Sequence, residues 1–183
     1  MNKSSKRRAA IPCKSRSTKS ALPALKLFAG EQKIVRLSSD NAAEFKECAE
    51  ALDIPHPTSV PYRPQGNDIE RSVGLVSDGM KVSLNTSGFD AFWAPLAARS
   101  FCQSLNVTRI ISDGKTAYEL DNPGKPFRSA ALAFGCAITV VPPKPLLEAA
   151  DKPEPRGKDA LSLGYHEHGG HIYGSALYVF LED

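Results

Sequence analysis

The sequence predicts an α/β fold in which helices come first and a small β-rich region comes last. Apolar residues recur at helical spacing between residues 20 and 105, prolines and glycines interrupt every period over residues 107–130, and short apolar or alternating runs follow from residue 131. With 42% hydrophobic and 23% charged residues, the 183-residue chain can form an ordinary core, which argues against a collagen, a coiled coil or a fully disordered chain. No apolar run reaches the roughly 20 residues that a membrane helix needs, so we expect no membrane partner.

Residues 1–19 form a basic segment that we expect to be a disordered arm. They hold seven basic residues and no acidic one, which leaves 16 basic against 20 acidic residues in the rest of the chain. A block of like charge repels itself and stays extended until phosphates neutralise it, so Arg7 and Arg8 are candidate nucleic-acid contacts. A solubilising tail, a nuclear signal or an organelle transit peptide fits the same composition. Nuclear and cytoplasmic locations both stay open.

Helical periodicity organises residues 20–106. The clearest case is a run of apolar residues at positions 69, 73, 76, 80 and 84, although Gly74 and Gly79 weaken it. Trp93 in a later helix is expected to lie in the core. The polar residues 38–41 are suited to capping a helix start. The expected helices cover residues 20–29, 42–52, 68–84 and 90–105, and a brief strand is expected at residues 34–37.

The remainder divides into a linker and a β-rich region. Residues 107–130 are expected to be an irregular linker, because glycine and proline recur there. Residues 131–183 are expected to form the small β-rich region, with strands near residues 137–141, 161–165 and 176–181. The four cysteines form no C-x-x-C pair, so neither a zinc knuckle nor a disulfide scaffold is indicated and a reducing compartment fits best.

Three histidines near the carboxyl end form one visible cluster of metal-ligand type. The alternation His166-x-His168 would place two imidazoles on one face of a strand, as in some metal sites, with His171 close in sequence. No cysteine or second carboxylate-rich segment accompanies them, and Gly169-Gly170 indicates an exposed turn. A purely structural explanation is therefore favoured by the sequence.

Two carboxylates are candidate metal ligands. The common nucleotide, hydrolase and zinc-protease motifs are absent from the sequence. Asp40 follows the expected strand and Glu70 begins an expected helix, so both sit on elements rigid enough to hold Mg²⁺. The alternative is that Asp40 only caps a helix and Glu70 only favours the positive end of a helix dipole.

A resemblance supplies a sharper hypothesis. The order S-D-N-x-x-E-F over residues 39–45, I-x-H over 54–56, S-x-P-Y-x-P-Q over 59–65 and N-x-x-E-R over 67–71 resembles the integrase catalytic core of retroviruses and LTR retrotransposons. The similarity continues through the Trp93 helix, and residues 114–118, 134–136 and 163–165 resemble the region that follows the core in copia-like Pol polyproteins. Residues 20–106 would then be a partial integrase core, the carboxyl half of an RNase H-like fold, and residues 131–183 a post-integrase region.

The resemblance implies a site and a chemistry. Asp40 and Glu70 match the second and third acids of the D,D-E triad, which binds Mg²⁺ or Mn²⁺ for 3′-end processing and strand transfer in DNA integration. The first catalytic Asp has no counterpart here, and positions 74 and 77 lack the lysines that retroviral members use to hold DNA ends, with Lys81 as a distant substitute. The residues expected to contact DNA are Tyr62, Arg63, Gln65, Asn67 and Lys81.

Two functions follow as expectations. The first is a fragment of a transposable-element integrase, ancestrally a D,D-E polynucleotidyl transferase, that has DNA as its partner, forms homo-oligomers as integrases do and is inactive as it stands. The alternative is a non-catalytic nucleic-acid-binding or protein-interaction module in which the basic arm supplies phosphate contacts.

Overall fold

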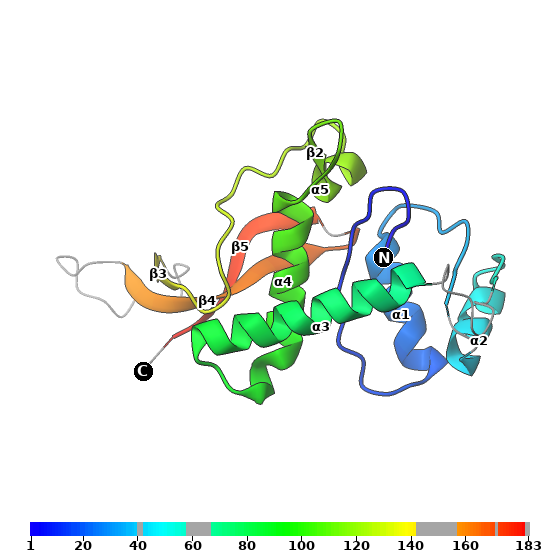
Figure 1. The fold of residues 1–183 in the computed structure, drawn as a ribbon, viewed down its shortest axis with the longest axis horizontal. Helices are drawn as coiled ribbons and strands as arrows, with labels where there is room; N and C mark the ends of the chain where they lie inside the picture. The colour runs from blue at the N-terminus through cyan, green and yellow to red at the C-terminus, as the bar shows by residue number, and fades with distance from the viewer. Residues whose placement is uncertain (40–41, 58–66, 142–156, 171, 182–183) are drawn as a thin grey trace.

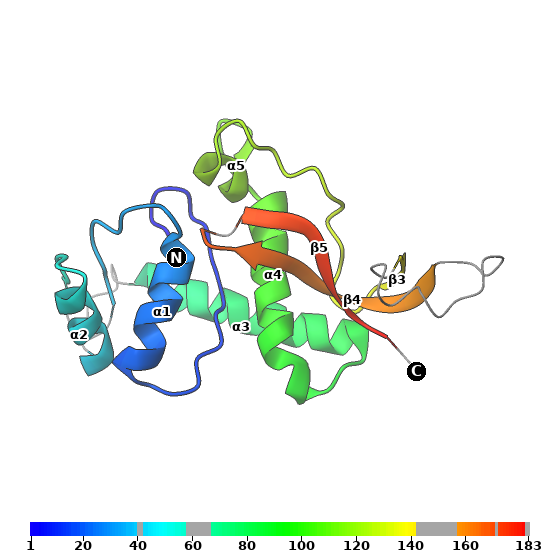
Figure 2. The same cartoon turned by 180° about the vertical axis from the view of Figure 1, so that it is seen from behind.

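The computed structural model describes residues 1–39, 42–57, 67–141, 157–170 and 172–181, and it mixes helices with a small antiparallel sheet (Figure 1). The predicted class, α/β with a small β-rich region at the carboxyl end, is confirmed. The helices α1 and α2 lie at one side of the molecule, α3 runs from them across the front, and α4 crosses α3 and carries the sheet on its other side (Figures 1 and 2). No helix in the described ranges is long and apolar enough to span a membrane.

The two amino-terminal helices agree with the sequence prediction. Helix α1 spans Thr18–Ala29 and ends at Gly30, whose positive φ of 60° and N–H bond to the Lys26 carbonyl oxygen close the last turn. Helix α2 spans Ala43–Ala51 and buries Cys48 and Ala49. The N-cap position is Ala42, which makes no side-chain cap, and Asp40 and Asn41 of the predicted capping cluster lie outside the described residues.

Helices α3 and α4 cross at a glycine. Helix α3 spans Asn67–Ser87, a short 3-10 helix η2 spans Ala91–Trp93, and α4 spans Ala94–Thr108. A Cβ atom on Gly79 would lie only 2.1 Å from the Phe101 ring, so the bare glycine backbone allows this ring of α4 to reach α3. Gly79 weakens helix propensity, and packing between the two helices explains its presence.

The core consists of two clusters on either side of the sheet's contact with α4. Ala97, Phe134 and Leu163 form the first, and Phe89 and Trp93 pack against it, as expected for Trp93. The second is aromatic: Tyr118 stacks on Tyr173 with ring centres 5.2 Å apart, and Tyr165 and Phe127 complete it. Both clusters join the helices to the β-rich region.

The carboxyl-terminal sheet has the order β3-β4-β5 and is antiparallel throughout. Its strands span Ala137–Val140, Lys158–His168 and Ile172–Phe180, which confirms the predicted β-rich region. The pairing between β4 and β5 shifts register twice, between Ser162 and Gly164 and between Tyr165 and Glu167. Such irregularities bend a strand and redirect its side chains.

Two local predictions are wrong. Residues 34–37 are not a strand, and among the described residues their backbone pairs through one bond, from the Leu37 N–H to the Pro55 carbonyl oxygen at 3.1 Å. Residues 107–130, expected to be an irregular linker, contain the hairpin of β1 (Ile110–Ser112) and β2 (Lys115–Thr116) and helix α5 (Ala117–Asp121). Helix α5 begins with a capping box in which Thr116 and Glu119 satisfy each other's backbone N–H groups.

Candidate functional site

Two of the integrase-like motif segments meet in the structure. Ser39, next to Asp40 in the S-D-N segment, lies 2.7 Å from His56 of the I-x-H segment, measured from the serine Oγ to the histidine Nε2. The bond from the Leu37 N–H to the Pro55 carbonyl oxygen joins the same two segments one step away. Helix α2 therefore leads away from the S-D-N segment and returns the chain to it. An open hollow of about 690 Å³ lies beside this contact, between α2 and residues 53–56.

The structure describes one of the two predicted metal ligands, Glu70. Asp40 lies outside the described residues, so its expected approach to Glu70 stays a prediction. Glu70 lies in the first turn of α3 and its side chain is exposed. Within the described ranges, no three histidine, cysteine or acidic side chains gather closely enough to hold a metal ion.

Most of the predicted DNA contacts of the core also lie outside the described residues. Tyr62, Arg63 and Gln65 lie outside the described residues, and Asn67 is the first residue of α3. Lys81 is 65% exposed on α3, and its Nζ atom lies 3.6 Å from the Asp78 carboxylate one turn before it. An exposed pair at that distance is weak, so the Lys81 ammonium stays accessible to a phosphate.

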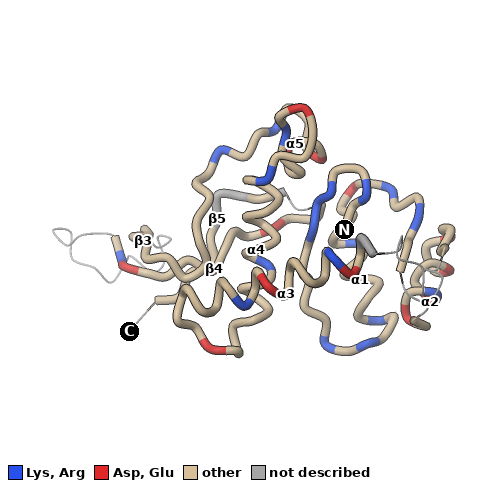
Figure 3. The backbone as a smooth tube through the Cα atoms, viewed as in Figure 1, with Lys and Arg blue, Asp and Glu red and all other residues tan. Residues whose placement is uncertain are grey.

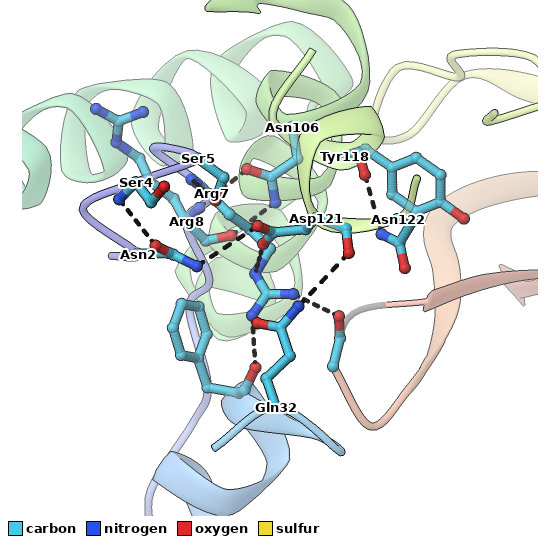
Figure 4. Close-up of polar contacts among 12 residues, drawn as sticks. Asn2, Ser4, Ser5, Arg7, Arg8, Gln32, Asn106, Tyr118, Asp121 and Asn122 are labelled. Carbon is cyan, nitrogen blue, oxygen red and sulfur yellow. Dashed lines mark hydrogen bonds and ion pairs between the residues drawn. The ribbon is translucent and has the colours of Figure 1, made fainter. Parts of the chain in front are cut away.

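Arg7, in contrast, is buried. Its side chain is 2% exposed and its Nε atom lies 2.8 Å from the Asp121 carboxylate at the end of α5. Its Nη1 donates to the Gly170 carbonyl oxygen at 2.6 Å and its Nη2 to the Phe28 carbonyl oxygen at 2.8 Å, while the guanidinium lies over the Phe28 ring (Figure 4). Burial lowers the pKa of Arg7, and the Asp121 carboxylate opposes that shift. Arg7 thus joins α1, α5 and the turn between β4 and β5.

Arg8 is half-buried beside it. Its backbone N–H donates to the Asn106 side-chain oxygen at 2.9 Å, its carbonyl oxygen accepts from the Asn106 Nδ2 at 2.7 Å, and its Nε donates to the Ser72 hydroxyl at 2.8 Å. Asn106 also donates to the Tyr173 hydroxyl at 2.9 Å. Burial lowers the pKa of Arg8, with Arg109 as a second cause. The Arg8 segment is therefore fixed between α3, α4 and β5.

These contacts correct the expected arm. Residues 1–8 were expected to be free and extended, but they pack into the folded body, and Arg7 is too buried to reach a phosphate. The reason is that carbonyl oxygens and an acidic side chain from distant segments replace solvent around the guanidinium. Four cations of this segment stay exposed: Lys3 in the turn at residues 3–5, and Lys14, Arg16 and Lys19 around the beginning of α1. Basic positions lie along this part of the chain (Figure 3).

The partners of Arg7 and Arg8 were not identified from the sequence. Asp121 and Asn106 lie far from these arginines along the chain, and neither belongs to a motif that indicates burial. The sequence did contain a signal for α5, namely Thr116 followed three residues later by Glu119, which is the pattern of a capping box.

No protein-family model matches the chain, and no curated protein matches it. Among solved structures, the chain is similar to the catalytic core domain of BIV integrase, with 22% identity and a TM-score of 0.44 over 60% of this chain and 72% of that one. It is also similar to a chain of the simian T-cell lymphotropic virus intasome in complex with the PP2A regulatory subunit B56 gamma, with 17% identity and a TM-score of 0.46. That similarity covers 92% of this chain and 63% of the other.

Proposed function

We propose that the chain is a piece of a retroelement integrase that retains a DNA-binding role and has no strand-transfer activity. The proposal rests on the contact between Ser39 and His56, which brings the S-D-N and I-x-H motifs together. The motif order along the sequence supports the same origin, as a partial RNase H-like core from a copia-like Pol polyprotein. Its ancestral activity would be DNA integration.

The donor set explains why we expect no catalysis. In such enzymes Mg²⁺ or Mn²⁺ stabilises the attacking and leaving oxygens of a phosphodiester. When two metal ions are bound, they need carboxylates that both ions share. The resemblance implies three acids, but the sequence supplies only Asp40 and Glu70, because the first catalytic Asp has no counterpart. We therefore assign no metal-dependent step to this chain.

DNA binding would use the surface that the motifs supply. Lys81 is exposed on α3, the same helix that begins with Asn67 and carries Glu70, so its ammonium and the motif residues belong to one element. Tyr62, Arg63 and Gln65 directly precede this helix in sequence. Lysine and arginine contacts to phosphate are independent of base sequence, so we expect binding without marked sequence preference.

A strand-transfer assay tests the absence of catalysis. The full chain is incubated with oligonucleotides that carry LTR-like ends, a supercoiled target and either Mg²⁺ or Mn²⁺, and joined products are quantified. We expect no joining above a protein-free control. Metal-dependent joining that Glu70→Gln abolishes would show that an intact site exists and would overturn this part of the proposal.

Fluorescence anisotropy with a labelled duplex tests which surface binds DNA. The core variant is Arg63→Gln/Lys81→Gln, and the arm variant is Lys14→Gln/Arg16→Gln/Lys19→Gln, whose three side chains are exposed. If the integrase-like core binds the DNA, the core variant should lose more affinity per removed charge than the arm variant. Replacement of Lys115 and Lys125, exposed near α5, is the control for net charge. If only the arm variant loses affinity, the alternative of a basic-arm module is correct.

A further inference from the structure

The imidazoles of His166 and His168 lie side by side on strand β4. Their ring centres are 4.9 Å apart and the ring planes are inclined at 64°. The two residues are separated by one position, which places both side chains on one face of an extended strand. His168 is exposed and His166 is half-buried.

The separation matches the chelation of one metal ion. A zinc-bound imidazole nitrogen lies about 2.0–2.1 Å from the ion and its ring centre about 1.1 Å further back, so the ion is about 3.2 Å from each ring centre. Ring centres 4.9 Å apart then subtend about 100° at the ion, between about 90° for square or octahedral and about 109° for tetrahedral ligands. The distance between the two rings is therefore compatible with one ion bound by both imidazoles.

The hairpin tip that carries the pair is held in place. The Gly170 N–H donates to the Leu27 carbonyl oxygen at 3.0 Å, and the Gly170 carbonyl oxygen accepts from Arg7 at 2.6 Å. His168 pairs with Ile172 across the turn, and the register of β4 against β5 shifts at His166. A bulge at such a position redirects a side chain, and a held turn reduces the ordering cost of binding.

The nearby charges favour neither binding nor exclusion of a cation. Arg99 lies over the Tyr178 ring at 5.1 Å, and Tyr178 lies 5.5 Å from His166. The Arg99 Nε is also 3.5 Å from the Glu167 carboxylate, whose other oxygen accepts from Gln103 at 2.6 Å. Because Glu167 offsets the charge of Arg99, the imidazoles are not opposed by an uncompensated cation.

We infer that His166 and His168 form a two-histidine site for a divalent transition-metal ion. Imidazole nitrogens suit copper, nickel and zinc, whereas magnesium and calcium prefer oxygen ligands. Cu²⁺ binds most tightly in the usual order of first-row ions, so it is the best probe. No third donor gathers with the pair among the described residues, and His171 lies outside them. This site is separate from Asp40 and Glu70 and does not depend on the integrase proposal.

The test titrates the full chain with Cu²⁺, without a histidine tag and after treatment with a chelator. Isothermal titration calorimetry gives the affinity and stoichiometry, and electron paramagnetic resonance counts the coordinating nitrogens. We expect one tight site with a signal from two imidazoles, binding of Ni²⁺ and Zn²⁺ at lower affinity, and no competition from excess Mg²⁺. His166→Gln and His168→Gln should each weaken Cu²⁺ binding at least about tenfold, because each removes half of the chelate.

His56→Gln is the matched control, since it removes one imidazole from a different segment, where the ring contacts Ser39. Far-ultraviolet circular dichroism and thermal unfolding of each variant without metal show whether the fold is kept. Wild-type affinity in folded His166→Gln or His168→Gln would overturn the inference. A wild-type spectrum with only one coordinated imidazole would also overturn it, and that measurement does not depend on the folding of any variant.

Discussion

Arg7 offers the sharpest test of how the chain is held together. Its guanidinium is 2% exposed and contacts Asp121, the Gly170 and Phe28 carbonyl oxygens and the Phe28 ring. Replacement by Met keeps much of the apolar volume and removes every charged contact. The Asp121 carboxylate, 7% exposed, is then left without its cation.

The expected loss follows from those contacts. Removal of one partner of a buried ion pair costs about 3–5 kcal/mol, because the other charge stays buried without compensation. The two bonds to carbonyl oxygens are charge-assisted and add to the cost, whereas relief of the buried guanidinium's desolvation reduces it. We therefore expect Arg7→Met to lower the free energy of unfolding by about 3–5 kcal/mol, a large part of the roughly 5–15 kcal/mol typical of a domain.

Urea unfolding followed by circular dichroism measures this change, with the slope against urea as a check on two-state behaviour. In the double variant Arg7→Met/Asp121→Asn the unpaired carboxylate is gone, so the double loss should be smaller than the sum of the single losses. Lys14→Met, an exposed cation of the same segment, is the control and should change stability by less than about 0.5 kcal/mol. A loss below about 1 kcal/mol for Arg7→Met, or additive losses in the double variant, would refute the buried-pair explanation.

Three further changes test the packing and the titration of the core. Gly30→Ala should destabilise by more than the roughly 1–3 kcal/mol of a left-handed residue, because φ is +60° and the new Cβ would lie 2.4 Å from the Gly170 backbone nitrogen; thermal unfolding that matches wild type would contradict this contact. Gly79→Ala places a Cβ 2.1 Å from the Phe101 ring, so we expect a net loss despite better helix propensity, and partial recovery when Phe101→Leu is added. Burial raises the pKa of the Cys102 thiol to about 12. Its contribution to stability is therefore complete below about pH 9, where the unfolded thiol begins to ionise, and is lost as the pH rises towards 12. Urea unfolding between pH 8 and 11 should show a shallower decline in the free energy of unfolding for Cys102→Ala than for wild type.

Local patterns predicted the helices well, because a helix is closed by bonds within its own segment. The apolar period over residues 69–84 identified α3, and the two helices before it agree closely with their predicted bounds. The segment at residues 34–37 shows the opposite case. Its composition favours a strand, but a strand needs a neighbouring strand, and within the described ranges this segment makes one backbone bond, to Pro55. Pairing between distant segments is not visible in a local pattern.

The candidate site could be predicted only as a set of motifs. The S-D-N and I-x-H segments were identified from the sequence, and the contact between Ser39 and His56 is the part that the structure adds. Asp40 and residues 62, 63 and 65 lie outside the described residues, so their predicted roles stay predictions. The sequence favoured a purely structural explanation for the histidine pair. The distance between the two rings could not be predicted, because it depends on strand register and on the turn that joins the strands.

The basic segment shows why counted charge overstates available charge. Residues 1–19 hold seven cations, but Arg7 is buried in an ion pair and Arg8 is engaged with Ser72 and held at Asn106. Five are left, namely the four exposed cations and the half-buried Lys6. Each neutralised phosphate contributes about −0.9 to the slope of log affinity against log salt, so this segment alone supports a slope no steeper than about −4.5, against about −6.3 for all seven. A steeper measured slope requires cations of the folded body such as Lys81, or release of the two arginines. Arg7→Met separates these cases, because it leaves the slope unchanged when the steepness comes from Lys81 and reduces it when Arg7 itself reaches the DNA.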